Sequence, residues 1–201
     1  NKKFIYLISP NKIKNEDFFC KLDQVLSSKK VSFFQLRLKK ESNRNQIYIG
    51  KKIKKICKKH KVIFLINDNP VIAKKVNADG CHLGQKDMNI LVARKILKNK
   101  IIGITCHNSI RLAKKAIDYG ADYLAFGSFY SSKTKKIRYK ASLKILTLAK
   151  KLTNTPVVAI GGIKDTNYKK LLLNKANFLA ISGYIWNNKK LNPKEAISKL
   201  I

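Results

Sequence analysis

Acidic residues are scarce in this chain, which has 11 Asp and Glu against 44 Lys and Arg and a formal charge of +33. A surplus of this size is typical of proteins that bind nucleic acid or anionic membranes. The cations, however, are nearly all lysines spread along the chain, and arginine stands only at positions 37, 44, 94, 111 and 138. We therefore interpret the charge as compositional, predict no specific nucleic-acid partner, and keep a non-enzymatic nucleic-acid binder as an alternative. The charge would still steer anionic substrates toward the protein.

Long hydrophobic runs are also lacking. A membrane-spanning helix needs roughly 20 apolar residues, whereas even the longest runs here, such as Val62–Ile66, are far shorter. The apolar stretch Phe4–Ile8 is too short for the core of a signal peptide, and no small-residue cleavage site follows it. The sequence therefore predicts a cytoplasmic protein with no membrane partner.

The four cysteines include no pair at C-x-x-C spacing. Cys81–His82 and Cys106–His107 could suggest a zinc site. Adjacent residues of a strand point to opposite faces, so each pair offers only one inward ligand. We expect structural cysteines without disulfides, as is usual in the cytosol.

Short β-rich runs alternate with helical patterns along the whole chain. The expected strands are Phe4–Ile8, Val31–Leu36, Val62–Ile66, Gly80–Leu83, Ile101–Thr105, Tyr123–Gly127, Val157–Ile160 and Phe178–Ser182. The expected helices are Glu16–Leu26, Ile47–Cys57, Val71–Val76, Ile90–Leu97, Ile110–Tyr119, Ser142–Leu152, Asn167–Leu173 and Pro193–Leu200. Asn15, Asn89, Ser109 and Asp165 are placed to cap helices. Eight such units predict a single (β/α)₈ TIM barrel over residues 1–201, with an open doubly wound sheet as the alternative.

Polar residues collect where the expected strands end, which is where active sites lie in this fold. The period of two places Gln35, Arg37 and Lys39 on one face of the second strand's end, a pattern that suits an anionic ligand. Asp68 and Asp87 follow the third and fourth strands and predict a Mg²⁺ ion that bridges to a phosphorylated group, although either could serve a turn or a cap.

The remaining strand ends suggest a phosphate site and one titratable group. Glycines at 161–162 and Ser182–Gly183 follow strands seven and eight, whose loops typically hold phosphate in this fold. His107 follows strand five and is either a general acid–base or an ordinary loop histidine. The loop 128–135 carries hydroxyls and lysines that could clamp a phosphate.

Together these segments resemble the thiamine-phosphate synthase family over nearly the whole chain. The matching stretches are Gln-Leu-Arg-x-Lys at 35–39, Ile-Asn-Asp at 66–68, Ala-Asp-Gly-Cys-His-Leu-Gly-Gln-x-Asp at 78–87, Ile-Ile-Gly-Ile-Thr-Cys-His at 101–107, Gly-Ala-Asp-Tyr-Leu-Ala-Phe-Gly at 120–127, Thr-Lys at 134–135 and Pro-Val-Val-Ala-Ile-Gly-Gly-Ile at 156–163. Members join hydroxymethylpyrimidine diphosphate to a thiazole phosphate and release pyrophosphate. The resemblance thus implies a transferase with small phosphorylated substrates and Mg²⁺ as its cofactor.

The resemblance also implies a role for each residue that matches the family pattern. Asp68 and Asp87 would hold Mg²⁺. The diphosphate would be bound by Arg37, Lys39, Asn67 and Lys135, of which Arg37 and Lys135 would act as catalytic residues. Gln35 and Thr105 would line the pyrimidine pocket, Ser132 and Thr134 would face the thiazole substrate, and the backbone at Gly162, Ser182 and Gly183 would cradle its phosphate.

Several positions depart from the family pattern. Asn69 stands where the family usually has Arg, Thr105 where it has Ser, the loop around Ser131 lacks the usual prolines, and Ser182–Gly183 replaces Val-Ser. A sister barrel of the thiazole tautomerase type, with His107 as its acid–base, is kept as an alternative. The oligomeric state stays open, with a homodimer among the options.

Overall fold

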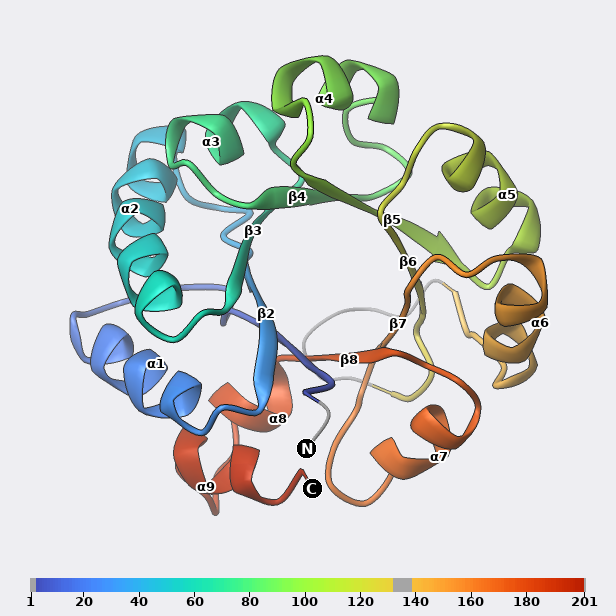
Figure 1. Cartoon of the computed structure of the whole chain (residues 1–201). Coiled ribbons are helices and arrows are strands. Elements are labelled where there is room, and N and C mark those ends of the chain that lie inside the picture. The colour runs from blue at the N-terminus through green and yellow to red at the C-terminus, as the bar shows by residue number, and fades with distance from the viewer. Residues whose placement is uncertain (1–2, 132–138, 201) are drawn as a thin grey trace.

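The computed structural model describes residues 3–131 and 139–200. Its strands form a closed parallel barrel in the order β1 to β8, and the helices surround it as an outer layer (Figure 1). The strands are β1 (Ile5–Ile8), β2 (Val31–Leu36), β3 (Ile63–Asn67), β4 (Gly80–Leu83), β5 (Ile101–His107), β6 (Tyr123–Gly127), β7 (Val157–Ile160) and β8 (Phe178–Ile181). This confirms the predicted TIM barrel and excludes the open sheet.

The helices follow their strands as expected. They are α1 (Asp17–Ser27), α2 (Asn43–Lys59), α3 (Pro70–Lys75), α4 (Ile90–Leu97), α5 (Ile110–Asp118), α6 (Lys144–Leu152), α7 (Tyr168–Leu173), α8 (Gly183–Trp186) and α9 (Pro193–Ser198). The sequence pattern missed α8 because four residues are too few to show a helical period. Trp186 of α8 donates from its indole Nε1 to the carbonyl of Ile8 at 2.7 Å, which ties this helix to the end of β1.

Side chains of the strands divide between two apolar layers. One layer fills the barrel and includes Tyr6, Leu65, Tyr123 and Val158. The other lies between the strands and the helices and holds the opposite residues of each strand, such as Phe34. The alternation of β2 is as predicted, since Phe34, Leu36 and Leu38 belong to the outer layer.

Two of the four predicted helix caps are confirmed. The side chains of Asn89 and Ser109 accept hydrogen bonds from the first turns of α4 and α5. The caps predicted at Asn15 and Asp165 are wrong, because α1 begins one residue later, after Glu16, and α7 begins after Asn167. Asp165 instead accepts from the neighbouring amide of Thr166, a local turn contact that competes with capping in short polar segments.

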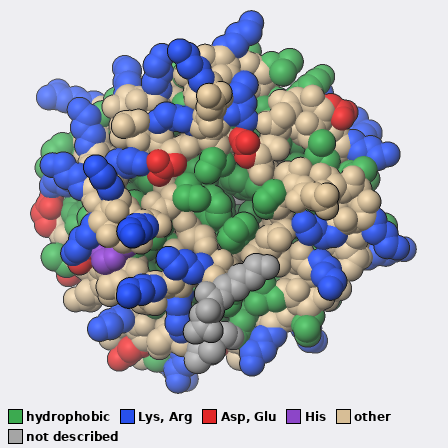
Figure 2. Space-filling view, viewed as in Figure 1, with side chains coloured by type: hydrophobic (Ala, Val, Ile, Leu, Met, Phe, Trp, Pro, Cys, Tyr) green, Lys and Arg blue, Asp and Glu red, His purple; other side chains and the backbone are tan. Residues whose placement is uncertain are grey.

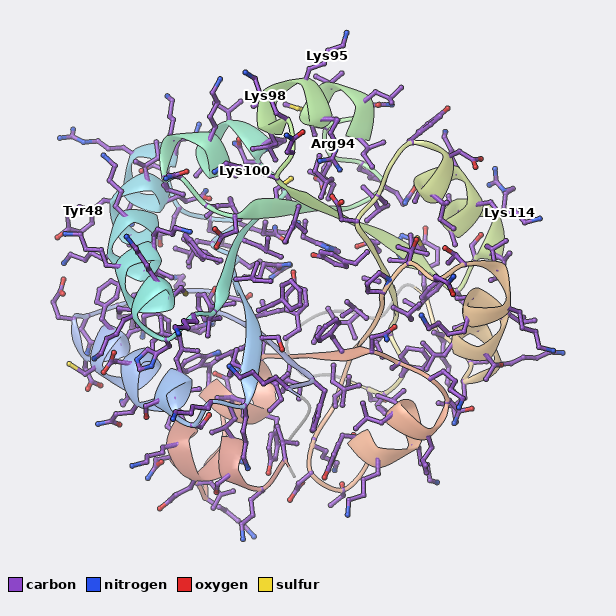
Figure 3. The ribbon with its side chains drawn as sticks, in the orientation of Figure 1. Tyr48, Arg94, Lys95, Lys98, Lys100 and Lys114 are labelled. Atoms are coloured by element: carbon purple, nitrogen blue, oxygen red, sulfur yellow. The ribbon has the colours of Figure 1, made fainter. Side chains whose placement is uncertain are left out.

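Arg94 joins several segments at the amino-terminal ends of the strands. Its Nη1 donates to the carbonyls of Lys98 and Lys100 at 2.8 and 2.6 Å, and its Nη2 donates to the carbonyl of Gly120 at 2.8 Å. Nη2 also pairs with the Asp122 carboxylate at 2.7 Å. Figure 3 shows Arg94 beside Lys100, between α4 and the barrel. This arginine therefore serves the fold and lies at the end of the barrel opposite to the predicted site.

The basic side chains do not gather in one stripe on the face that Figure 2 shows. Lys and Arg lie around its whole periphery, and apolar side chains occupy the centre. Lys95 and Lys114 point outward from α4 and α5 (Figure 3). No helix among the described residues has the length and apolar character needed to span a membrane.

Candidate functional site

Arg37 and Lys39 follow β2 and lie close to the carboxylate after β3. Lys39 Nζ lies 2.6 Å from Asp68 Oδ2 in an ion pair. The backbone amide of Arg37 donates to Ser9 Oγ and its guanidinium Nη1 donates to Asn11 Oδ1, both at 2.9 Å. Burial lowers the pKa of Arg37, and the nearby charge of Asp68 opposes that shift. Two cations from one strand end thus meet a carboxylate from the next strand.

The carboxyl groups of Asp68 and Asp87, the two predicted Mg²⁺ ligands, lie close enough to shift each other's pKa. Asp87 Oδ2 also accepts from the amide of Gly84 at 2.7 Å. Burial alone would raise the pKa of Asp68, but the hydrogen bond from Asp87 and the ion pair with Lys39 hold it below its ordinary value. Burial and the Asp68 carboxylate raise the pKa of Asp87. The two carboxyl groups therefore interact, and Asp87 is the one with the higher pKa.

Two cavities open beside these carboxylates. The larger one, of about 490 Å³, is lined by Asn43, Ile47, Asp68, Asn69, Pro70, Val71, Ile72, Lys75, Lys86, Asp87 and Met88. The smaller one, of about 230 Å³, is lined by Leu38, Lys39, Gln46, Asn67, Asp68 and Asn69. Asn67, a predicted diphosphate ligand, thus lines the same cavity as Lys39 and Asp68.

Asn69 has a local structural role at the position where the family usually has Arg. Its Oδ1 accepts from the amide of Ile72 at 3.0 Å and so caps α3. Pro70 at the first position of that helix removes one donor that would otherwise need a partner. A helix cap thus stands where the family usually has a long cation.

A chain of hydrogen bonds crosses the barrel interior below the mouth. Gln35 Nε2 donates to the Tyr6 hydroxyl at 2.7 Å, and that hydroxyl lies 2.7 Å from the hydroxyl of Tyr123. His82 then bridges Tyr123 and Thr105, because its Nδ1 lies 2.8 Å from the Tyr123 hydroxyl and its Nε2 lies 2.8 Å from Thr105 Oγ1. Gln35 and Thr105, both predicted to line the pyrimidine pocket, are thus the two ends of one chain.

The sequence interpretation missed the three middle members of this chain. Tyr6, His82 and Tyr123 each occupy an inward position of β1, β4 or β6, and the period of two could have placed them inside the barrel. Burial lowers the pKa of His82 to about 4, so its ring is neutral at physiological pH. Gly103 makes room for Tyr123, since a Cβ at residue 103 would lie 1.8 Å from Tyr123 Cζ.

The glycines after β7 form a tight turn against the segment that follows β6. Gly161 and Gly162 have φ values of +113° and +60°, a region that favours glycine. A Cβ on Gly162 would lie 2.3 Å from the carbonyl oxygen of Ser131. Ser182 and Gly183 follow β8, the strand that pairs with β7. Ser182 directly precedes α8, and its Oγ donates to the carbonyl of Ser9 at 3.0 Å. Their predicted contact with a phosphate stays a prediction.

His107 ends β5 with a φ of +53° and stacks on Tyr139, with ring centroids 3.9 Å apart. It belongs to the mouth of the barrel but not to the hydrogen-bonded chain that includes His82. Ser132, Thr134 and Lys135 were predicted to contact the thiazole substrate and the diphosphate, and all three lie outside the described residues.

Comparison with known proteins identifies the family of this barrel. The family model described as thiamine monophosphate synthase matches residues 5–185. This chain belongs to the thiamine monophosphate synthase family. A thiamine-phosphate synthase from Pelagibacter ubique is 74% identical over 200 residues, which cover 100% of this chain and 97% of the relative. One from Nitrosomonas eutropha is 38% identical over 91% of this chain and 86% of the relative.

Solved structures agree with this family assignment. A thiamine phosphate pyrophosphorylase from Pyrococcus furiosus superimposes with a TM-score of 0.86 at 30% identity, covering 100% of this chain and 94% of that one. A 3-hexulose-6-phosphate synthase reaches a TM-score of 0.69 at 17% identity, covering 98% of each chain. The second likeness concerns the fold alone. As a member of the thiamine monophosphate synthase family, the chain is an enzyme of the transferase class.

Proposed function

We propose that this chain is a thiamine-phosphate synthase, which joins hydroxymethylpyrimidine diphosphate to a thiazole phosphate and releases pyrophosphate. The observation that carries the proposal is the 74% identity, over the whole chain, to a thiamine-phosphate synthase. The cluster of Arg37, Lys39, Asp68 and Asp87 at one corner of the barrel mouth supports it, because isomerisation of a thiazole phosphate needs no diphosphate site.

Departure of the diphosphate is the step that this cluster would assist. The bond between the exocyclic carbon of the pyrimidine and the diphosphate oxygen breaks, and both electrons leave with the oxygen. The thiazole nitrogen then forms its bond to that carbon with its lone pair. Arg37, Lys39 and Lys135 would bind the growing negative charge, and Asn67 would donate a hydrogen bond to it. Such preorganised donors commonly supply the largest part of a rate enhancement.

The carboxylates of Asp68 and Asp87 fit a magnesium ion in the chemistry of their donors. Mg²⁺ prefers oxygen ligands and is commonly held by one or two carboxylates together with substrate phosphates. Among the described residues, no three His, Cys, Asp or Glu side chains form a metal-binding group, so this pair would depend on phosphate oxygens and water for the rest. When bound, the ion would neutralise charge on the diphosphate.

The two ring systems would occupy the mouth on either side of the diphosphate. Gln35 and Thr105 would contact the pyrimidine from β2 and β5. Ser132 and Thr134 would face the thiazole, whose phosphate would accept hydrogen bonds from the backbone at Gly162, Ser182 and Gly183. Both substrates must bind together, because the cation left by diphosphate departure has to meet the thiazole nitrogen at once.

The proposal also includes a cytoplasmic location and the assembly of the protein. The three buried cysteines, Cys57, Cys81 and Cys106, are free thiols, as expected in the reducing cytoplasm. We keep a homodimer as the assembly to be tested by sedimentation of the purified protein, and we assign no specific nucleic-acid or membrane partner.

A single assay tests the proposed reaction. Purified protein is given both substrates with Mg²⁺, and thiamine phosphate and pyrophosphate are measured over time. We expect equal amounts of the two products, none when either substrate is left out, and none in excess chelator. Isomerisation of the thiazole phosphate without coupling would favour the tautomerase alternative and would overturn the proposal.

A further inference from the structure

The hydrogen-bonded chain inside the barrel links residues of five strands to the mouth. Gln35, Tyr6, Tyr123, His82 and Thr105 come from β2, β1, β6, β4 and β5, and each consecutive pair of polar atoms is 2.7 or 2.8 Å apart. Gln35, Tyr6 and Tyr123 are each no more than 3% exposed, so water does not replace their contacts. His82 and Thr105 are half-buried, and Thr105 is the end of the chain that we place toward the mouth.

The direction of the hydrogen bonds follows from counting donors. Gln35 donates through Nε2, so the single proton of the Tyr6 hydroxyl remains for Tyr123. The Tyr123 proton is then left for His82 Nδ1, which must be an unprotonated acceptor. In a neutral imidazole the proton consequently lies on Nε2, which donates to Thr105 Oγ1. The Thr105 hydroxyl proton is the one left over, and it is free to donate toward the mouth.

The opposite direction leaves a buried group without a partner. If Thr105 donated to His82 Nε2, the Nδ1 proton of His82 would point to the Tyr123 hydroxyl and the Tyr123 proton to the Tyr6 hydroxyl. The Tyr6 proton would then face the Gln35 amide nitrogen, which is itself a donor. A buried hydroxyl proton with no acceptor destabilises this arrangement, because the group has lost its water partner and gained none. Only a Gln35 amide turned to present its oxygen would remove that cost.

We propose that His82 is held as the Nε2–H tautomer by Tyr123 and Tyr6, and that it thereby makes the Thr105 hydroxyl a fixed hydrogen-bond donor for a ring nitrogen of the pyrimidine substrate. This assignment rests on the proposed function for the identity of the substrate. His82, Tyr123 and Tyr6 are then positioning residues, because they act through Thr105. A Thr105 hydroxyl held as a donor favours a ligand with a hydrogen-bond acceptor facing it and disfavours a ligand with a donor there.

The tautomer can be read directly, without substrate. Long-range ¹H–¹⁵N NMR spectra of the histidine rings, assigned with His60→Gln and His107→Asn variants, report which nitrogen of His82 carries the proton. We expect an unprotonated Nδ1 and a protonated Nε2 in the wild type at pH 7.5. In Tyr123→Phe, where the ring still fills the space beside Gly103, we expect signals of both tautomers. A wild-type His82 with its proton on Nδ1 would overturn the proposal.

The consequence for the reaction is a selective change in KM. Tyr123→Phe should raise the KM for the pyrimidine substrate about tenfold, the size expected for one lost neutral hydrogen bond, and should change kcat less. Tyr119→Phe, an exposed tyrosine at the end of α5, is the matched control and should behave like the wild type. Circular dichroism verifies that both variants fold.

Substrate analogues separate positioning from packing. Two pyridine analogues of the pyrimidine diphosphate each replace one ring nitrogen by C–H. For one of them the wild type should show a raised KM, and in Tyr123→Phe that penalty should largely disappear. Equal penalties in the two proteins would overturn the role of the chain in selectivity. Failure of the wild type to form thiamine phosphate would overturn the proposed function instead, since the NMR result does not depend on it.

Discussion

Lys39 and Asp68 form an ion pair of 2.6 Å, although one belongs to the predicted diphosphate site and the other to the predicted metal site. Without ligands, the lysine supplies the positive charge that the carboxylate needs. When substrate and Mg²⁺ bind, Mg²⁺ would pair with the Asp68 carboxylate in place of Lys39. Lys39 would then be free to bind the diphosphate. The two binding events would therefore be coupled.

Asp68→Asn tests this arrangement. The amide is a poor Mg²⁺ ligand and does not pair with Lys39, so we expect turnover to fall by about 10²–10³, the usual cost of losing one preorganised partner of developing charge. Raising the Mg²⁺ concentration should recover only part of the lost turnover. Asp23→Asn is the control, because Asp23 pairs with Lys59 and His60 on the helical exterior. Full activity of Asp68→Asn in excess chelator would contradict the metal role.

Arg37→Ala and His107→Asn distinguish the synthase from the tautomerase. Losing Arg37 should lower turnover by about 10²–10³, and Lys135→Ala should do the same. His107→Asn should cost much less, because no proton transfer limits diphosphate departure. Asn is the suitable replacement since it tolerates the φ of +53° at this position better than most residues. Steady-state turnover ranks the three variants by their loss of activity, and circular dichroism checks that each one folds. If His107→Asn is inactive and Arg37→Ala active, the isomerase assignment is the correct one.

Stability should fall in mildly acidic solution because of His82. Burial lowers its folded pKa to about 4, whereas the ordinary value is 6.5. Between these values the unfolded chain binds a proton that the folded protein does not, so the free energy of unfolding rises with pH across this window. The contribution is complete above pH 6.5 and is lost as the pH falls toward 4. Urea unfolding from pH 4 to 7.5 should show a flatter profile for His82→Asn, and identical profiles would refute this explanation.

Arg94→Lys should destabilise the fold without affecting catalysis. A lysine cannot reach the three carbonyls and Asp122 together, because it lacks the planar fork of the guanidinium. We expect a loss of about 1–3 kcal/mol in the free energy of unfolding and an unchanged KM. Arg111→Lys, at an exposed position, is the matched control. Chemical denaturation of both variants measures the difference.

Binding to duplex DNA should be weak, independent of sequence and steeply dependent on salt. Lys and Arg side chains lie around the whole periphery of the face in Figure 2, so they offer diffuse charge and not one basic stripe. Fluorescence anisotropy with two unrelated duplexes at low and physiological salt is the measurement. Sequence-selective binding that persists at physiological salt would revive the nucleic-acid alternative.

Much of the site could be predicted because the barrel converts sequence order into position. Once the strands are recognised, Gln35, Arg37 and Asp68 must lie at the same end, since parallel strands all finish there. The apolar runs and the period of two are local properties, and they sufficed for the strands, the faces of β2 and two of the helix caps.

Contacts between distant segments were decided only by the tertiary structure. The sequence identifies Tyr6, His82 and Tyr123 as polar residues within buried strands, but not that their hydroxyls and ring nitrogens meet. It places Asn69 where a phosphate ligand is usual, and only the fold shows that this side chain caps α3. The physical reason is that strand patterns arise from neighbours along the chain, whereas hydrogen bonds and ion pairs across the barrel depend on closure and register to within an ångström.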